Sequence, residues 1–522
     1  MITVNNIKLP LKYDNDVIKT SVAKSLNIRN SDISSLVLRR VSIDARKKDN
    51  VHYIAMVDVS VACNEQSICS RCKNAHISVN NDYVFPSGKL LKHRPIIIGA
   101  GPAGLFCALM LSRVGAKPII IERGMPVEER TRCIENFWSG GVLNPQSNVQ
   151  FGEGGAGTFS DGKLNTGTNN IRGSFILKEF VAHGAPEEIL ISAKPHIGTD
   201  KLKSCIISIR KEIESHGGEF RFNTLFTDLI LSNGCVAGIK VNSEGTTETI
   251  YSDKVILAIG HSSRDTFVKL RDIGVEMQQK PFSIGVRIEH LREDVDECQY
   301  GKARHLLGAA DYKLSTHLND GRGVYTFCMC PGGYVVNASS EDGMLCTNGM
   351  SLFARDNVNS NSALLVGVSP EDYNCGDVLD GMMLQRKIET AAYKAIGNNI
   401  APVQRVGDFL GIKTKKYSNV HPSIRPGYDF FDIEKIYPSF ISDSMKEGIL
   451  NLSRKMSVFS DSGAILTAAE TRSSSPVRIV RDDSCQSVSF KGLYPCGEGA
   501  GYAGGIMSAA ADGIKCAEAI MS

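Results

Sequence analysis

Three glycines and one acid are the residues whose types and spacing most clearly imply a chemistry. Gly99, Gly101 and Gly104 lie between a run of β-branched residues and a segment of helical character. A second apolar run follows this segment and ends on Glu122. Strand, glycine turn, helix, strand and terminal acid form the pattern of a dinucleotide-binding βαβ unit.

Each of these residues has a physical task in such a unit. Gly99 permits the tight turn, Gly101 lets the backbone approach a pyrophosphate, and Gly104 lets the helix pack on the strand. The phosphates then lie at a helix N-terminus, where free N–H groups and the helix dipole favour anions. Glu122 would accept hydrogen bonds from a ribose diol and would repel a 2′-phosphate. The pattern therefore predicts FAD or NAD rather than NADP.

The elements around this unit indicate more than one domain. Residues 1–90 predict a small N-terminal α+β domain, in which Asp14 caps a helix and two strands, 36–43 and 53–61, flank a basic turn. The arginines and lysines of this hairpin allow RNA contact, but no aromatic residues interleave with them. A solvated hairpin is the favoured interpretation.

The rest of the chain divides into an FAD-binding domain and an insertion. Residues 91–280 hold the βαβ unit, a long loop at 124–163, a helix, a β-meander and a further buried strand. Residues 281–457 change to short strands and loops rich in Gly, Asn and Cys and predict an inserted substrate or cap domain. Residues 458–522 return to the FAD-binding domain. The predicted fold class is α/β: a Rossmann-like domain with an inserted α+β domain and the small N-terminal α+β domain.

Composition excludes several classes of protein. A chain of 522 residues with a net charge of +3 is too long for one core and shows no bias toward nucleic acid. Its 15 cysteines follow no regular spacing, which favours reduced thiols and a cytoplasmic location. The uncharged apolar stretch 95–111 is too short to span a membrane comfortably. Cys63, Cys69 and Cys72 lack a second ligand pair, so no metal is predicted.

Further motifs occur together in a fixed order. They are GEGGAGTFSDGKLNT at 152–166, AIGHSSRDTF at 258–267, CMCPGG at 328–333, ETRSSSPVRI at 470–479 and GLYPCGEGAGYAGGI at 492–506. With the glycine turn they resemble a bacterial family of uncharacterised FAD-dependent dehydrogenases, NAD(P)/FAD-dependent oxidoreductases among the glutathione-reductase-like, two-dinucleotide-binding flavoproteins. The resemblance implies FAD, a fused substrate domain and an oxidoreductase.

The resemblance also implies where FAD lies. Gly497 and Glu498 stand where relatives use Gly-Asp, the helix that Gly504 and Gly505 open faces the flavin, and the loop at 154–163 lies against its ring. The complete predicted cofactor-binding set is Gly99, Gly101, Pro102, Ala103, Gly104, Glu122, Arg123, Gly155, Gly157, Thr158, Ser160, Gly162, Lys163, Gly260, Gly497, Glu498, Gly504, Gly505 and Ile506.

Catalytic residues are less well defined, because the flavin itself carries the redox chemistry. Lys163, His261 and Arg472 are candidates, and packing or salt-bridge roles compete with each of them. Cys328 and Cys330 form a Cys-x-Cys pair, for which buried thiols are favoured over a redox dithiol.

The predicted function is an FAD-dependent oxidoreductase that transfers a hydride between flavin and a small molecule. FAD is expected to be non-covalent, with NAD(P)H as a transient electron donor. The alternatives are a flavoprotein that modifies RNA or protein and a non-enzymatic FAD-binding protein. No nucleic-acid partner and no membrane span are expected, and the sequence predicts neither the substrate nor the oligomeric state.

Overall fold

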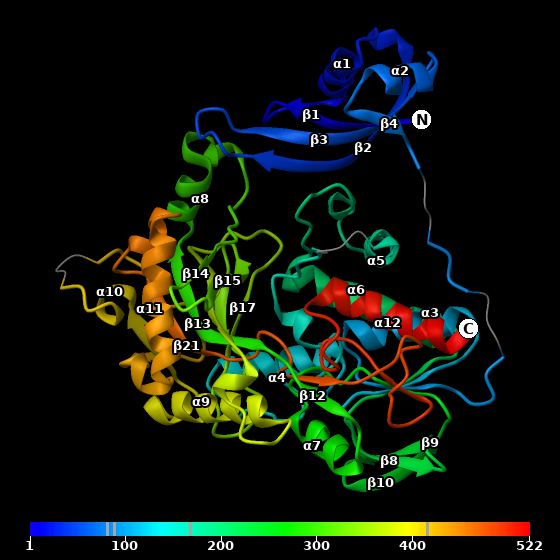
Figure 1. Cartoon of the computed structure of the whole chain (residues 1–522), viewed down its shortest axis with the longest axis vertical. Coiled ribbons are helices and arrows are strands. Elements are labelled where there is room, and N and C mark those ends of the chain that lie inside the picture. The colour runs from blue at the N-terminus through cyan, green and yellow to red at the C-terminus, as the bar shows by residue number, and fades with distance from the viewer. Residues whose placement is uncertain (80–82, 87–89, 166–169, 414–416) are drawn as a thin grey trace.

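The computed structural model describes residues 1–79, 83–86, 90–165, 170–413 and 417–522 (Figure 1). Its first module contains β1 (Ile2–Leu9), α1 (Asn15–Leu26), β2 (Ile33–Asp44), β3 (His52–Val61), α2 (Glu65–Arg71) and β4 (Ala75–Ile77). The strand order is β2-β3-β1-β4, the split βαβ arrangement of ferredoxin-like folds. As predicted, Asp14 caps α1: its carboxylate accepts a hydrogen bond from the Val17 N–H at 2.9 Å.

The edge of this module pairs with the next part of the chain. Val41 of β2 donates its N–H to the Ile191 carbonyl at 2.7 Å, and its own carbonyl accepts from the Ala193 N–H at 2.9 Å. An otherwise unpaired strand edge is thus satisfied within the molecule. The basic hairpin is also paired internally, since Arg39 contacts Asp58 and Arg46 contacts Asp44.

A parallel five-stranded sheet carries the glycine turn. Its order is β23 (Leu493–Pro495), β11 (Val255–Leu257), β5 (Ile96–Ile98), β6 (Ile119–Ile121) and β7 (Glu219–Arg221). The two central strands consist entirely of isoleucine because helices or strands cover both faces of the sheet. The Rossmann-like element predicted from the sequence is confirmed.

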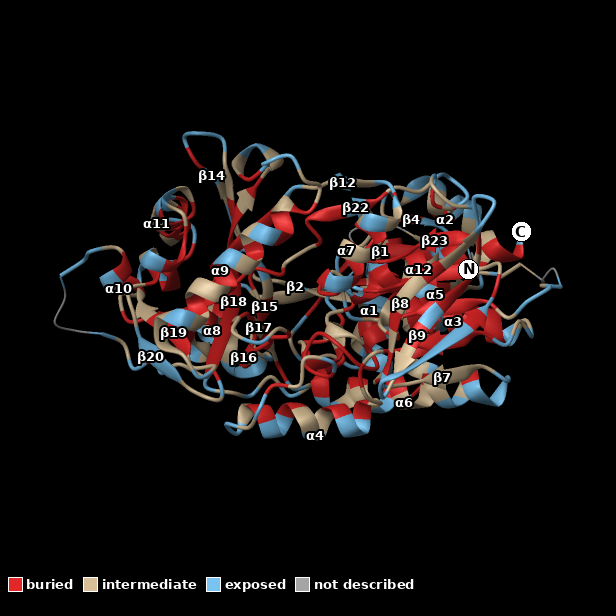
Figure 2. Ribbon diagram, turned by 90° about the horizontal axis from the view of Figure 1, so that it is seen from below, coloured by how far each residue is buried: buried red, intermediate tan, exposed pale blue. Residues whose placement is uncertain are grey.

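Different elements pack on the two faces of this sheet. Ile97 and Ile120 pack with α3 (Pro102–Arg113), α6 (Gly198–Ser215) and α12 (Ile506–Met521). Ile96 and Ile98 pack against the predicted meander, which is a three-stranded sheet. Its strands are β8 (Thr224–Ser232), β9 (Cys235–Ser243) and β10 (Thr246–Tyr251). In Figure 1 α3 and α12 lie side by side although they come from distant parts of the chain, and Figure 2 shows how thoroughly this region is buried.

A second, mostly antiparallel sheet of seven strands builds the other half of the molecule. Its order is β14 (Ser315–His317), β15 (Gly323–Cys330), β18 (Asn359–Val368), β13 (Phe282–Leu291), β21 (Ile465–Glu470), β19 (Ala401–Arg405) and β20 (Tyr428–Phe430). Only β19 and β20 pair in parallel among the described strands of this sheet. The sequence pattern assigns residues 458–522 to the FAD-binding domain, but β21, which lies in that range, pairs with β13 and β19 of this sheet.

Helices and short strands complete the fold. The helices are α4 (Val127–Trp138), α5 (Ile171–Ala182), α7 (Arg264–Ile273), α8 (Arg292–Tyr300), α9 (Asp380–Ile396), α10 (Val406–Phe409) and α11 (Ser439–Ser453). The short strands are β12 (Met277–Gln279), β16 (Tyr334–Asn337), β17 (Thr347–Met350) and β22 (Val477–Ile479). Every helix of the described residues is too short or too polar to cross a membrane.

Two sequence-based expectations were wrong. The supposed long loop at 124–163 contains α4, and the region of supposed short strands and loops contains two ten-residue strands and the long helices α9 and α11. The inward face of α9 includes Gln385 and Glu389, so polar residues interrupt its apolar periodicity. Burial with charge partners, which the sequence does not display, makes these polar positions part of the core.

Those charge partners join the two halves of the molecule. The Glu389 carboxylate is fully buried between Arg264, from the start of α7, and Arg472, which follows β21. Its oxygens accept hydrogen bonds from Arg264 at 2.7 and 2.8 Å and from Arg472 at 2.8 and 3.0 Å. Burial alone would raise the pKa of Glu389, but the two guanidinium groups outweigh it and hold that pKa well below its usual range.

We expect Glu389→Gln to destabilise the protein by about 3–5 kcal/mol, because two buried guanidinium groups lose their counter-charge. The urea midpoint, followed by circular dichroism, measures the loss. Glu341→Gln is the matched control: Glu341 also pairs with Arg264 but is partly exposed, so about 1 kcal/mol or less is expected. Equal shifts in the two variants would contradict the central role of Glu389.

Candidate functional site

One cavity of about 630 Å³ lies between the carboxyl ends of the parallel strands and the seven-stranded sheet. The FAD-binding half contributes the turn after β5, the end of β6, the turn after β11, the loop at 150–163 and the start of α12. The other half contributes Thr326–Met329, Asn348 and 470–473. Ligands of open α/β sheets bind at this edge of the strands.

The glycine turn is shaped by close backbone approach. A Cβ at Gly99 would lie 2.3 Å from the Ala258 carbonyl oxygen, and one at Gly104 would lie 1.9 Å from the Gly99 oxygen. Gly101 differs, because the nearest atom to its Cβ would be the Gly155 Cα at 3.8 Å, and the residue lines the cavity. Gly101 is also the N-cap of α3, where no described side chain caps the helix. An anionic group fits this position.

Glu122 lines the same cavity and also fastens its wall. One carboxylate oxygen accepts the Ala100 N–H at 2.8 Å, and the other accepts the N–H groups of Gly124 and Gly152 at 2.9 Å each. A carboxylate has about four acceptor positions, so a ribose hydroxyl can still bind. The adjacent Arg123 pairs with Asp265 at 2.8 Å, and its guanidinium lies 4.4 Å from the centre of the Phe151 ring.

A buried arginine that sequence reasoning missed shapes the glycine-rich loop. Arg130 of α4 donates hydrogen bonds to the backbone carbonyls of Asn148, Val149, Gly152 and Glu153 at 2.6–3.3 Å. The available signal was its spacing from Val127, Ile134 and Phe137, which places all four on the buried face of one helix.

Glu153, an acid of the glycine-rich loop, is buried like Arg130. The Glu153 carboxylate accepts the Val127 N–H at the start of α4 at 2.8 Å and lies 3.0 Å from Arg210. Burial raises the pKa of Glu153 to about 7. The loop is therefore fixed by buried polar contacts rather than free at the surface.

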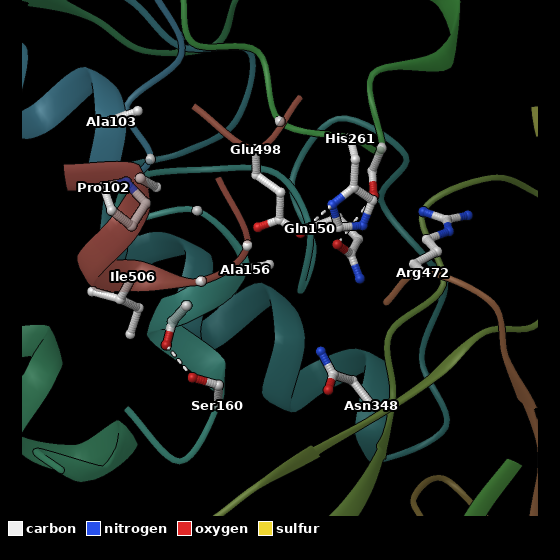
Figure 3. A pocket seen from close by; sticks show the side chains of 18 of the residues that line it. Pro102, Ala103, Gln150, Ala156, Ser160, His261, Asn348, Arg472, Glu498 and Ile506 are labelled. Carbon is white, nitrogen blue, oxygen red and sulfur yellow. Dashed lines mark hydrogen bonds and ion pairs between the residues drawn. The ribbon is translucent and has the colours of Figure 1, made fainter. Parts of the chain in front are cut away.

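A second helix begins at the cavity. Gly504, Gly505 and Ile506 line the wall at the start of α12, whose N-cap residue, Gly505, has no side chain to cap the helix. Nearby, Glu498 faces His261, with 3.1 Å between its carboxylate oxygen and the His261 Nδ1 (Figure 3). Two uncapped helix N-termini, those of α3 and α12, therefore meet one cavity.

Fifteen of the predicted cofactor-binding residues line this cavity, together with the catalytic candidates His261 and Arg472. The other four, Gly104, Thr158, Gly162 and Gly497, lie behind its wall. Thr158 is fully buried and contacts the Glu153 carbonyl, and the Gly497 N–H donates to Asp512 at 2.7 Å. Cavity residues missed from the sequence include Gln150, Asp161, Asn165, Lys194, Phe327, Asn348 and Glu470.

The Asp512 carboxylate of α12 already has hydrogen-bond partners within the protein. Its side chain lies within 4.8 Å of Cys496 and Cys516, a grouping that could hold a metal ion. Both carboxylate oxygens, however, accept hydrogen bonds from Arg481, at 2.6 and 2.9 Å, besides the one from Gly497. Asp512 thus positions the turn that carries Glu498.

The three catalytic candidates differ in the partners that their side chains already have within the protein. The Arg472 guanidinium is committed to Glu389 and Ser340, so its fork does not face a ligand. The Lys163 ammonium contacts the Met329 carbonyl across the cavity, and its half-buried side chain lines the wall. His261 is paired with Glu498.

Fold and site define a flavoprotein, and comparisons with known proteins agree. Residues 281–473 match the family model described as FAD-dependent protein, C-terminal domain-like, and residues 1–60 match a domain of unknown function. FAD is the cofactor. A protein of Clostridium beijerinckii described as uncharacterized is 47% identical over 530 residues, which cover 100% of this chain and 98% of that protein. The chain belongs to the family of this protein.

Solved structures of flavoproteins are more distant. A triple mutant of the flavin-dependent brominase Bmp2 is 14% identical, covers 82% of this chain and 80% of its own, and has a TM-score of 0.36. A geranylgeranyl bacteriochlorophyll reductase-like protein of Thermoplasma acidophilum is 12% identical, covers 82% and 77%, and has a TM-score of 0.37.

Arg130→Met is expected to weaken FAD binding roughly tenfold or more, since each carbonyl left without a donor costs about 1–3 kcal/mol. Fluorescence titration of the apoprotein with FAD measures the dissociation constant. Arg132→Met, an exposed position on the same helix, should bind FAD as the wild type does. An unchanged affinity in Arg130→Met would show that the loop does not need this side chain.

Gly101→Val should give a folded protein that purifies without FAD. The added side chain has room in the protein, with its Cβ in ordinary contact with Gly155, but it fills the space beside the N-terminus of α3. Absorbance at the flavin bands and the thermal midpoint are the two measurements. Gly308→Val serves as control, because Gly308 is exposed and its Cβ would meet nothing within 4 Å. A yellow Gly101→Val protein would contradict the assignment.

Proposed function

We propose that the protein is an FAD-dependent oxidoreductase that acts on a small molecule. The observation that carries this proposal is the cavity between the two halves, in which two helix N-termini without a capping side chain meet residues of the seven-stranded sheet. One half has the donors for a dinucleotide, and the other half has side chains that can contact a second molecule. A carrier of FAD alone would not need this second half.

The residues of the first half would hold FAD in an extended form. Gly101 and the start of α3 receive the pyrophosphate, while Glu122 accepts the adenosine ribose hydroxyls. Glu498 accepts hydrogen bonds from hydroxyls of the ribityl chain, and His261 holds the Glu498 carboxylate in position. The N-terminus of α12 faces the flavin, where its dipole favours negative charge. We propose that FAD binds non-covalently.

The second half would bind the substrate. Phe327 is 40% exposed and gives an apolar surface, Asn348 offers an amide, and Lys163 brings a cation. Bound FAD supplies two-electron redox chemistry, so these residues need only orient the reacting molecule and exclude water. Mixed apolar and polar contacts of this kind favour a small organic substrate over a macromolecule.

Domain roles follow from this arrangement. We assign residues 91–280 and 458–522 to the FAD-binding domain, 281–457 to the substrate domain and 1–90 to a separate module, except that β21 pairs with β13 and β19 in the sheet of the substrate domain. Arg39 and Arg46 of the basic hairpin already pair with acids of the same module, which argues against RNA docking there. We further propose that the protein is a cytoplasmic dehydrogenase that uses NAD(P)H as a transient electron donor.

Native mass spectrometry followed by anaerobic reduction tests the function. The purified protein should carry one FAD that denaturation releases, and the flavin absorbance should bleach with dithionite. Mixing the reduced protein with oxygen, a quinone and a small disulfide should restore the absorbance rapidly with at least one acceptor. A colourless protein that takes up no FAD would overturn the proposal. Bound FAD that no acceptor reoxidises would indicate a non-enzymatic FAD-binding protein instead.

A further inference from the structure

Two cysteines occupy the wall that faces the flavin half of the cavity. β15 ends on Phe327-Cys328-Met329-Cys330, of which the first three residues line the cavity. Cys330 is fully buried directly behind them. The Cys330 thiol donates a hydrogen bond to the Cys328 carbonyl oxygen at 3.3 Å, and the two thiols lie close enough to shift each other's pKa. A pair of thiols thus lies close together at the surface of the proposed active site.

The strand that carries the two residues is irregular. The register between β15 and β18 shifts between Phe327 and Cys330, and Cys328 has a φ of 43°, in the left-handed region. A residue other than glycine is costly there, by about 1–2 kcal/mol. Residues two apart in a strand have Cα atoms separated by about 6.6 Å, which lies within the disulfide range, near its upper end.

The charges around the pair distinguish its two members. Arg287 donates to the Cys328 carbonyl at 2.8 Å, and the Lys163 ammonium contacts the next carbonyl, that of Met329. Two acids, Glu470 and Asp161, lie further out, each with its own guanidinium partner.

These surroundings make one thiol more acidic than the other. The hydrogen bond from Cys330 lowers the pKa of Cys328, burial opposes this, and the positive charges of Arg287 and Lys163 lower it further. The same hydrogen bond, with burial, raises the pKa of Cys330. A thiolate beside a protonated thiol is the arrangement from which a disulfide forms and opens.

We propose that Cys328 and Cys330 are a redox-active dithiol that exchanges electrons with the flavin. In the oxidising direction the Cys328 thiolate and the Cys330 thiol lose two electrons and one proton. The S–H bond of Cys330 breaks and an S–S bond forms between the two sulfurs, while the electrons and the proton pass to oxidised FAD. In the opposite direction the disulfide would take up two electrons and one proton, so that its S–S bond breaks and the Cys328 thiolate and the Cys330 thiol form again. This inference rests on the proposed function, because it places the flavin beside Cys328.

Anaerobic titration with dithionite tests the pair directly, because each equivalent supplies two electrons. Oxidised wild-type protein should consume about two equivalents per FAD, one for the flavin and one for the disulfide. Cys328→Ser and Cys330→Ser should each consume about one. Cys298→Ser is the matched control, since Cys298 is half-buried in the same domain but does not line the cavity, and it should consume two. One equivalent in the wild type would overturn the dithiol while leaving the flavin function intact.

A second measurement does not depend on the variants or on bound FAD. The wild-type apoprotein is treated with diamide, its free thiols are alkylated, and peptide mass spectrometry locates the unmodified cysteines. A disulfide-linked peptide that contains Cys328 and Cys330, and that a reductant opens, supports the pair. Equal alkylation of both residues with and without diamide, after unfolding, would overturn it.

Discussion

The Glu122 carboxylate is the contact on which the geometry of the site depends. It binds the backbone N–H groups of Ala100, Gly124 and Gly152, which belong to three separate loops. These are the glycine turn, the segment after β6 and the glycine-rich loop. A charged acceptor holds buried N–H donors about twice as strongly as a neutral one. The acid at the end of the second strand therefore shapes the cofactor pocket in addition to offering a ribose contact.

Buried charge joins the two halves of the molecule on either side of the cavity. Glu389 of α9 binds Arg264 at the start of α7 as well as Arg472, and within the seven-stranded sheet Arg287 of β13 pairs with Glu470 of β21 at 2.9 Å. Such ions are costly to bury and tolerate only complete pairing. The requirement fixes the half that contains the seven-stranded sheet against the half that contains the parallel sheet, and with it the distance across the cavity.

The sequence predicted the cofactor half of the site well. The isoleucine strands, the glycine turn, the meander and the helix after Gly505 all lie where local pattern placed them, because each depends on residues close in the chain. It predicted the substrate half poorly. The long helices α9 and α11 and the helix α4 went unrecognised, since buried polar residues such as Arg130 and Glu389 break the apolar periodicity that identifies a helix.

The sequence by itself determined the class of fold, because a glycine turn between two strands with a terminal acid is a local constraint on the backbone. The further motifs, through the family they resemble, narrowed the cofactor from FAD or NAD to FAD. Only the tertiary structure decided which candidates face the cavity. It committed Arg472 to Glu389, moved Gly497 and Thr158 behind the wall, and brought Cys328 to its surface. Burial and charge pairing act between residues far apart in the chain, and spacing along the sequence carries no record of them.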